Sequence, residues 1–510
     1  MEETDMCHPI PAFFAVQQAI PNGCPAKALH PEQRRDIGLQ ALAGTQTVTR
    51  LADQFDVSRK FVGQQRTIAE QALDDAFGPQ PAAERVLFHL PVSKQWIRQF
   101  TLGLVLICHS SLRGTVEMLR DLFDYRMSVG TAFNIVQQAV TGARQHNQAE
   151  DLRRIRVGAH DEIFQARRPV LVGVDPLSSY CYLCSPESHR DADTWAVRLL
   201  ELHERGFHPD YVLADAGSGL RAGQAQALPT IPCRSDVFHA LHQAGAAAAR
   251  LESRAYEAMT TYATLELKAA RYQYRHGRPD PSCVQRRTLA GKRQTQAIQL
   301  ADDVALLVRW LRDDVLSLAG PPQAERLALY DFLVAELRAR LPQAPALLGA
   351  LVTYLVGQRD DLLAFAGQLD RDLAALAARF AVAPALVRRL FAVQTLPADS
   401  GRRWHLDAPL RPLLGRRYFA LARALDRLRR RCVRASSAAE NLNSRLRNYF
   451  FLRRHLGPDY LELLRFFLNH RPLPRSQHRE RAGRSPAQVL TGQSHRHWLE
   501  LLGYTRFSRN

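Results

Sequence analysis

The pattern of apolar residues predicts a short β-sheet near the middle of a chain that is otherwise helical. Three apolar, β-rich runs cover residues 155–164, 169–174 and 180–184, and short turns separate them. Runs of this length joined by tight turns are typical of an antiparallel meander of three strands. The sequence therefore predicts a compact β-region that begins about 155 residues into the chain.

A helix and a fourth strand are expected after the meander. Asp191 or Asp193 can cap the helix at its start, and Gly206 can end it. Its apolar stripe consists of Trp195, Leu199 and Leu202. The fourth strand, residues 211–214, leads directly into Asp215, and a short fifth strand is expected around residues 230–233.

Before the sheet, the chain predicts a helical DNA-binding region. Residues 1–30 are rich in proline and have no helical or strand period, so we expect a poorly ordered lead-in. Residues 47–62 have the pattern of a helix-turn-helix, in which Phe55–Val57 form the turn and Ser58 caps the second helix. The expected inward positions are Val48, Leu51 and Ala52, and the exposed ones that can reach phosphates and base edges are Arg59, Lys60, Gln64 and Gln65. Helix pairs also occur as plain packing units, but DNA binding is the favoured interpretation.

A second helix pair is expected from Thr115 to Val136, after a loop that includes residues 78–81. Its predicted buried positions are Leu119, Leu122 and Phe123, and Ser128 is the expected cap. Here DNA binding and simple packing are equally good interpretations.

Helical periodicity then dominates from about residue 245 to residue 425. One clear stripe consists of Val304, Leu307, Leu311 and Val315, and residues 325–341 and 360–380 show similar patterns. This segment holds no metal or nucleotide motif, so we interpret it as an inserted scaffold and a wall that faces DNA.

A further helix after residue 434 brings in the candidate Glu440. One face is polar and contains Glu440, Asn443, Ser444 and Arg447, and the other is apolar and contains Leu442, Leu446 and Tyr449. Another apolar helix is expected within residues 450–470. Residues 471–486 are a basic, irregular tail, and its final Gly-x-Ser-Pro phrase is expected to precede a short helix.

Charge points to a polyanionic partner. The chain has 510 residues, a net charge of +18 and a pI near 10.0. Residues 402–484 hold 21 Arg and no Lys against 6 Asp or Glu, a surplus of 15. Such a surplus is typical of nucleic-acid binding, because each neutralised phosphate releases counterions.

Other compositional features favour a cytoplasmic protein. No run of apolar residues is long enough for a membrane span, and the acidic N-terminus does not resemble a signal peptide. The 8 Cys are scattered, and Cys181 and Cys184 are expected to be buried thiols, because no second pair follows at zinc-site spacing. No Walker-type loop occurs, so no nucleotide cofactor is expected.

Three motifs together resemble the DDE transposases, in the branch with an all-helical insertion. They are the phrase from Ala214 to Leu220, the phrase Asp236-Val-Phe-His239, which is similar to a motif of Mutator-like members, and the helix of Glu440. The order meander, helix, strand is that of an RNase H-like core, so the expected class is α+β and multidomain, with the core interrupted by the insertion. The expected domains cover residues 1–30, 31–80, 81–150, 151–244, 245–425, 426–470 and 471–510.

The resemblance implies a specific active site and partner. Asp161, Asp215 and Glu440 would hold two Mg²⁺ or Mn²⁺ ions, and Asp236 and His239 would lie nearby in a secondary role. Arg447 joins the expected DNA contacts. The implied function is a transposase that binds the double-stranded terminal repeats of its mobile element and cleaves and joins DNA strands at a target. We expect a homo-oligomer on DNA, without a membrane partner, in the bacterial cytoplasm at the nucleoid.

Alternatives exist for individual residues and for the function. Asp175 also ends an apolar strand, but placing it on the first strand would leave the meander one strand short, so Asp161 is preferred. Asp236 and His239 could equally be a helix cap and a hydrogen-bonded core histidine. The alternative function is a catalytically silent DNA-binding regulator derived from such an enzyme.

Overall fold

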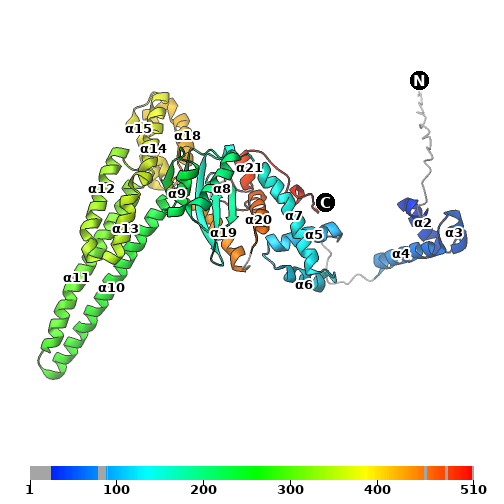
Figure 1. Cartoon of the computed structure of the whole chain (residues 1–510), viewed down its shortest axis with the longest axis horizontal. Coiled ribbons are helices and arrows are strands. Elements are labelled where there is room, and N and C mark those ends of the chain that lie inside the picture. The colour runs from blue at the N-terminus through cyan, green and yellow to red at the C-terminus, as the bar shows by residue number, and fades with distance from the viewer. Residues whose placement is uncertain (1–24, 79–87, 89, 453–455, 477–479, 508–510) are drawn as a thin grey trace, which may run out of the picture. The chain divides into compact units, whose positions relative to one another are not determined.

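The protein is an α+β protein whose helices far outnumber its strands (Figure 1). The computed structural model describes residues 25–78, 88, 90–452, 456–476 and 480–507. They belong to two compact units, residues 1–90 and 91–510, each described below by itself.

The first unit is a small group of helices with its own hydrophobic core. Its helices are α1 (Pro25–Ala28), α2 (Pro31–Leu42), α3 (Val48–Gln54) and α4 (Arg59–Phe77). The core consists of Ile37, Ala41, Leu51, Ala52 and Val62. Thr47 caps α3 and Ser58 caps α4, and Asp56 takes a left-handed conformation (φ 52°) in the turn between them. The predicted helix pair and its turn are therefore confirmed as local structure.

Two N-terminal predictions are only partly covered. Of the expected lead-in, residues 1–24 lie outside the described residues, and α1 begins at Pro25, so residues 25–28 are helical rather than irregular. Pro25 suits the first helical position because proline lacks an N–H that would need a partner there. Most of the loop expected at residues 78–81 also lies outside the described residues.

Five strands form one mixed sheet in the second unit, in the order β3-β2-β1-β4-β5. The strands are β1 (Val157–Gln165), β2 (Arg168–Val174), β3 (Cys181–Pro186), β4 (Tyr211–Ala214) and β5 (Cys233–Ser235). β1, β2 and β3 form the antiparallel meander, whereas β4 is parallel to both β1 and β5. The expected meander and fourth strand are confirmed.

The fifth strand was predicted too early. It begins at Cys233 rather than at residue 230 because Pro229 and Pro232 cannot donate ladder hydrogen bonds. Pro232 can still accept one, and its carbonyl receives the N–H of Val212 at 2.9 Å.

Helices cover both faces of the sheet. On one face, α8 (Ala192–Glu204) and α9 (Ser218–Ala227) pack against the sheet through a core that includes Trp195, Leu199 and Leu202. Asp191 caps α8, as expected, through the N–H of Thr194. The opposite face is covered by α5, α7, α19 and α20, whose bounds are Lys94–Leu106, Val129–Ala149, Ser437–Leu452 and Pro458–His470.

The predicted second helix pair is present, but its burial was predicted incorrectly. It consists of α6 (Leu112–Phe123) and α7, and Ser128 caps α7. Leu119 is buried, whereas Leu122 is 65% exposed and Phe123 is 39% exposed. The Phe123 ring contacts the rings of Trp96 and Phe100 of α5, so this side of α6 packs at the margin of the core. The apolar face of α7 belongs to the same core as the sheet, so the segment expected as a separate helical region packs with it.

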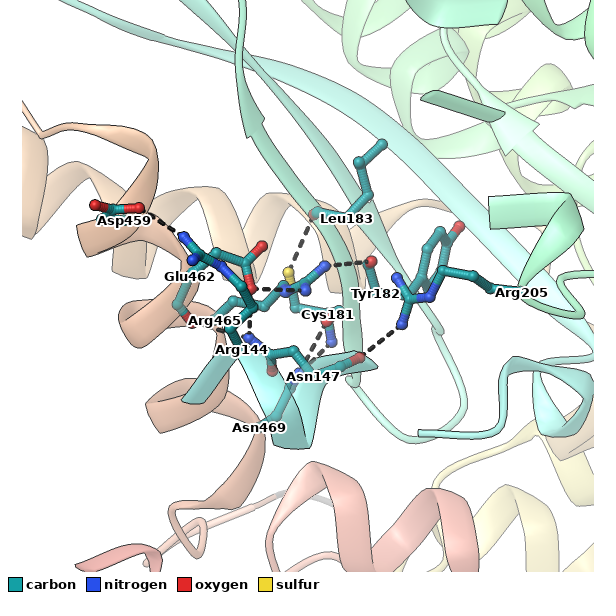
Figure 2. A network of polar contacts seen from close by, with 10 residues as sticks. All are labelled: Arg144, Asn147, Cys181, Tyr182, Leu183, Arg205, Asp459, Glu462, Arg465 and Asn469. Carbon is teal, nitrogen blue, oxygen red and sulfur yellow. Dashed lines mark hydrogen bonds and ion pairs between the residues drawn. The ribbon is translucent and has the colours of Figure 1, made fainter. Parts of the chain in front are cut away.

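Side chains of α20 close the edge of strand β3 (Figure 2). The Asn469 amide accepts the N–H of Cys181 and donates to its carbonyl, both at 2.8 Å, and Arg465 donates to the Tyr182 carbonyl at 2.9 Å. These bonds replace the partners that a sixth strand would supply, so they satisfy an edge that could otherwise pair with another chain. Cys181 and Cys184 are buried, as predicted, and the structure records both as free thiols.

A large helical segment lies between β5 and the helix of Glu440. Its main helices are α10 (Val237–His276), α11 (Pro281–Trp310), α12 (Gln323–Arg340), α13 (Pro345–Gly357), α14 (Arg359–Phe380), α15 (Pro384–Thr395), α16 (Gly401–Asp407), α17 (Leu410–Leu414) and α18 (Tyr418–Arg431). The predicted stripe of Val304, Leu307, Leu311 and Val315 is buried. Two hydrophobic cores hold the segment together, one around α10–α14 and one around α14–α18.

The C-terminal part returns to the sheet. After α20, Leu473 forms an isolated bridge with Ala482, and Ser485 caps α21 (Pro486–Thr491), so the short helix expected after the Gly-x-Ser-Pro phrase is present. The last helix is α22 (Trp498–Leu501). Among the described residues, no helix combines the length and apolar character that crossing a bilayer requires.

Candidate active site

The tertiary structure brings Asp161 and Asp215 to neighbouring parallel strands. Ala159 of β1 is paired with Leu213 of β4, and each aspartate lies two residues further along its strand direction. Side chains alternate along a strand, so Asp161 points to the same face of the sheet as Val157, Ala159 and Ile163. This is the face that α19 covers. Both carboxylates are partly exposed.

A tight turn after β4 fixes Asp215. Its Oδ1 accepts the N–H of Gly217 at 2.8 Å. A Cβ atom at position 217 would lie only 2.9 Å from that oxygen, so glycine permits the close approach. The carbonyl of Asp215 accepts a hydrogen bond from Nε of Arg221 at 3.0 Å.

Asp161 has an unusual electrostatic environment. Burial raises its pKa to about 7, and the negative charges of Glu440, Asp215 and Glu162 add to this effect. The N–H of Glu162, 2.8 Å from Oδ1, opposes the shift. A carboxyl group surrounded by other acids binds a proton readily, and would bind a metal cation for the same reason.

Helix α19 places Glu440 and Asn443 beside this carboxyl. Ala439, Leu442 and Leu446 are buried against β1 and β2, which orients the helix. Nδ2 of Asn443 then donates to Oδ2 of Asp161 at 2.6 Å. Glu440 lies one turn before Asn443 and is partly exposed.

Asn443 is a site residue whose role the sequence did not indicate. It was placed on the polar face with Ser444 and Arg447, which are exposed, but Asn443 is only 2% exposed. Its Oδ1 is buried and has no hydrogen-bond partner among the described residues. The three-residue spacing from Glu440 was the available signal, but only the packing of α19 on β1 shows that Asn443 faces inward.

Glu162 has a different role from its neighbour. It points to the opposite face of the sheet, where Oε1 accepts the indole N–H of Trp195 at 3.0 Å and Oε2 pairs with Arg190 at 2.8 Å. Its charge is therefore already neutralised within the fold.

Asp236 lies at the start of α10, next to the end of β4, and His239 lies one turn further along this helix. Asp236 is buried, caps α10 through the N–H of Phe238 at 2.7 Å, and accepts the hydroxyl of Ser436, just before α19. The His239 ring lies 6.2 Å from that of Tyr354, whose pKa burial raises to about 12, with a smaller contribution from Asp236. The contacts of Asp236 match the alternative of a helix cap.

Asp175 lies in the turn after β2, away from the strand of Asp161. Its carboxylate accepts the N–H of Leu177 at 3.1 Å, and the N–H and hydroxyl of Ser178 at 3.0 and 2.5 Å. Burial raises its pKa, and these bonds oppose the shift. The side chain stabilises the turn, as the strand count predicted.

The expected DNA-contacting side chains are distributed over both units. In the first unit, Arg59, Lys60 and Gln64 are exposed on α4, whereas Gln65 is partly buried. The backbone oxygen of Gln65 lies 2.7 Å from where a Cβ at Gly38 would be, so α2 covers this position. In the second unit, Arg447 is exposed on α19.

The arginine-rich region 402–484 does not form a single exposed surface. Burial lowers the pKa of both Arg434 and Arg445. Others pair with carboxylates, as Arg411 does with Asp407 at 2.9 Å. Part of the surplus of positive charge in this region is therefore buried or paired with carboxylates of the same protein.

Within the described part of the chain, no three His, Cys, Asp or Glu side chains are grouped closely enough to hold a metal ion as they stand. The three carboxylates are near enough for Glu440 and Asp215 to shift the pKa of Asp161. Like charges repel, so a cation would have to draw these side chains together.

Comparison of the chain with models of known protein families gives no match, and comparison with curated proteins gives none either.

Proposed function

We propose that this chain is a transposase of the DDE type, which cleaves DNA strands at the ends of a mobile element and joins them to a target. The observation that carries the proposal is the position of Asp161 and Asp215 at adjacent points of two parallel strands, with the charge of Glu440 acting on Asp161. The strand order β3-β2-β1-β4-β5, with an antiparallel meander first, is that of an RNase H-like core and supports the same proposal.

The donor set fits divalent cations that prefer oxygen ligands. Three carboxylates, together with the buried and unpartnered Oδ1 of Asn443, offer hard oxygen atoms in one region. When bound, Mg²⁺ or Mn²⁺ would lower the pKa of the attacking hydroxyl and stabilise the leaving oxygen. The residues of the chain would bind the ions and hold the carboxylate of Asp161 in place through the amide of Asn443.

In this proposal, the first unit reads the DNA sequence. Helices α3 and α4 have the order of a helix-turn-helix, and the exposed start of α4 carries Arg59 and Lys60. Such a helix can enter the major groove, where base edges differ between base pairs. The element's own terminal repeats are the expected target.

The direct test is nicking of a labelled DNA fragment that carries the element's end, in Mg²⁺ or Mn²⁺. Asp161→Asn, Asp215→Asn and Glu440→Gln should each abolish cleavage while DNA binding remains, because each removes one ligand of a shared site. Ser444→Ala, an exposed change on the same helix, is the matched control and should cleave normally.

Metal binding can be tested without catalysis. Added Mg²⁺ should raise the melting temperature of the wild-type protein, since a ligand that binds only the folded state stabilises it. The increase should disappear in Asp161→Asn and remain in Ser444→Ala. If the protein binds DNA but does not cleave it, and Mg²⁺ does not change its melting temperature, the silent DNA-binding regulator would be favoured instead.

A further inference from the structure

Helices α10 and α11 form a long hairpin with a sharply defined tip. Gly277 ends α10 in the left-handed conformation (φ 65°), which glycine adopts without strain. Asp280 caps α11 through the N–H of Ser282 at 3.1 Å, and Pro281 occupies the first helical position. The chain therefore reverses direction within a few residues.

The outer part of this hairpin is held together mainly by its own two helices. Tyr262 packs on Gly291, where a Cβ would lie 3.3 Å from its ring, and the thiol of Cys283 points at the Leu265 carbonyl. The core that joins the hairpin to its neighbours extends only to Ala255 on α10 and Ala297 on α11. We call residues 256–296 the arm, and Figure 1 shows its tip extending beyond α12 and α13. At about 1.5 Å per residue, the part of helix α10 that lies in the arm is roughly 30 Å long.

The arm has a strong excess of positive charge. Residues 256–296 contain eight basic side chains and three acidic ones, Glu257, Glu266 and Asp280, of which Asp280 is occupied as the helix cap. The basic residues, exposed except for the partly buried Arg287, are Lys268, Arg271, Arg275, Arg278, Arg286, Arg287, Lys292 and Arg293. No ion pair is recorded for any of them within the described part of the chain. By contrast, Arg340 and Arg359 in the same insertion each pair with two carboxylates.

The spacing of these charges arranges them into stripes. Lys268, Arg271 and Arg275 are three and four residues apart, so they share one face of α10. On α11, Arg286 and Arg293 are seven residues apart and also share a face. Clustered cations without counter-charges repel one another, so they contribute nothing to folding, and they match a partner with regularly spaced negative charges.

We propose that the arm binds the phosphate backbone of double-stranded DNA, at a surface separate from the carboxylates. Duplex DNA carries about one negative charge per 1.7 Å of its axis, so an arm of this length can contact several phosphates without reading the sequence. The proposal rests on the proposed function only for the identity of the polyanion. It assigns to the insertion a specific binding surface in place of a general wall.

The test measures the salt dependence of DNA binding by the full-length protein. A variant with Arg271, Arg275, Arg278 and Arg286 changed to Gln is compared with the wild type on a labelled duplex of arbitrary sequence over a range of KCl concentrations. If these side chains contact phosphates, the slope of log K against log salt should become shallower by up to about 3–4, since each contact contributes about 0.9. Exposure of the four side chains predicts an unchanged circular dichroism spectrum.

Two matched variants separate a local surface from net charge. Changing Arg309, Arg312, Arg338 and Arg371 to Gln removes the same charge from exposed positions elsewhere in the insertion and should leave the slope unchanged. Changing the four arm arginines to Lys keeps the charge and should retain the wild-type slope. An equal loss of slope in both Gln variants, or none in the arm variant, would overturn the proposal.

Failure of the catalytic proposal would give a different result. Asp161→Asn should keep the wild-type salt slope while nicking is lost. If the wild-type protein never nicks DNA but the arm variant still loses its slope, the arm remains a DNA-binding surface and the transposase proposal fails.

Discussion

At the scale of single residues, the two faces of strand β1 give adjacent side chains opposite electrostatic roles. Glu162 meets Arg190 and the indole of Trp195, so its charge is satisfied. Asp161 faces the other acids, and its carboxylate accepts hydrogen bonds from the Asn443 amide and the Glu162 N–H, both of which are uncharged. No cationic partner of Asp161 is recorded among the described residues, and this distinguishes the proposed catalytic carboxyl from Glu162.

The raised pKa of Asp161 predicts a pH-dependent effect on stability. Between about pH 4 and pH 7 the folded state binds more protons than the unfolded state, so stability falls as the pH rises from about 4 through 7 and levels off above. In the presence of a chelator, Asp161→Asn should raise the melting temperature more at pH 8 than at pH 5, by roughly 2–4 °C. Thermal unfolding at both pH values checks this, with Asp302→Asn, a change at an exposed aspartate, as control, and an identical shift at both would contradict it.

Asp175 should matter for stability rather than for cleavage, the opposite of what we expect for Asp161. Asp175→Asn places an amide N–H₂ against N–H donors of the turn, so we expect a loss of about 1–3 kcal/mol in the free energy of unfolding. Nicking should persist below the lowered melting temperature. Loss of nicking with unchanged stability would show that Asp175, not Asp161, belongs to the site.

At the scale of elements, caps and packing surfaces determine what each helix presents. Ser58 starts α4 so that Arg59 and Lys60 are exposed at its first turn. In α19, the burial of Ala439 and Leu442 turns Asn443 towards β1. The function of each helix follows from its orientation as much as from its composition.

The first turns of α4 give a prediction for sequence recognition. Gln64→Ala should reduce discrimination at one base position by about 1–3 kcal/mol, because a side-chain amide can bond to a base edge. Lys60→Ala should instead make the salt slope shallower by about 1 at every sequence. Binding of residues 25–78 to the element's end and to random DNA would be compared, and equal affinity for both would rule out the reader role. Asp74→Asn, near the far end of α4, is the control.

At the scale of the whole second unit, the site is connected to the helical insertion. Arg221, which donates to the Asp215 carbonyl, also pairs with Asp361 of α14 at 2.6 Å and donates to Ser235 of β5. Ser235 in turn donates to Gln358 at 2.6 Å. These bonds connect the insertion to the end of β4, where Asp215 lies, and help to hold it in place.

A double-mutant cycle tests this connection. Arg221→Ala and Asp361→Ala should show a coupling energy of about 0.5–3 kcal/mol in stability, since residues in one network are not additive. Asp361 is 43% exposed, so a value near the lower end is expected. If the losses in the free energy of unfolding from the two single mutations add up to that of the double mutant within about 0.3 kcal/mol, the two residues are not coupled.

The sequence alone determined the local structure of the sheet and its neighbours. Alternating apolar runs, turn residues and caps specified the meander, α8 and β4, and the strand count placed Asp161 on β1 and Asp175 in a turn. These features follow from short-range chemistry, which the order of residues states directly. The fifth strand begins later than expected because Pro229 and Pro232 lack the N–H groups that a strand ladder needs.

Only the tertiary structure decided which residues meet. It brought Asn443 to Asp161 across a separation of 282 residues, and it exposed Leu122 although the sequence predicted its burial. It also showed that some arginines of residues 402–484, such as Arg434 and Arg411, are buried or paired, whereas no ion pair is recorded for the basic side chains of the arm in the described part of the chain. Burial and charge pairing depend on neighbours distant in the chain, and periodicity along one segment carries no information about them.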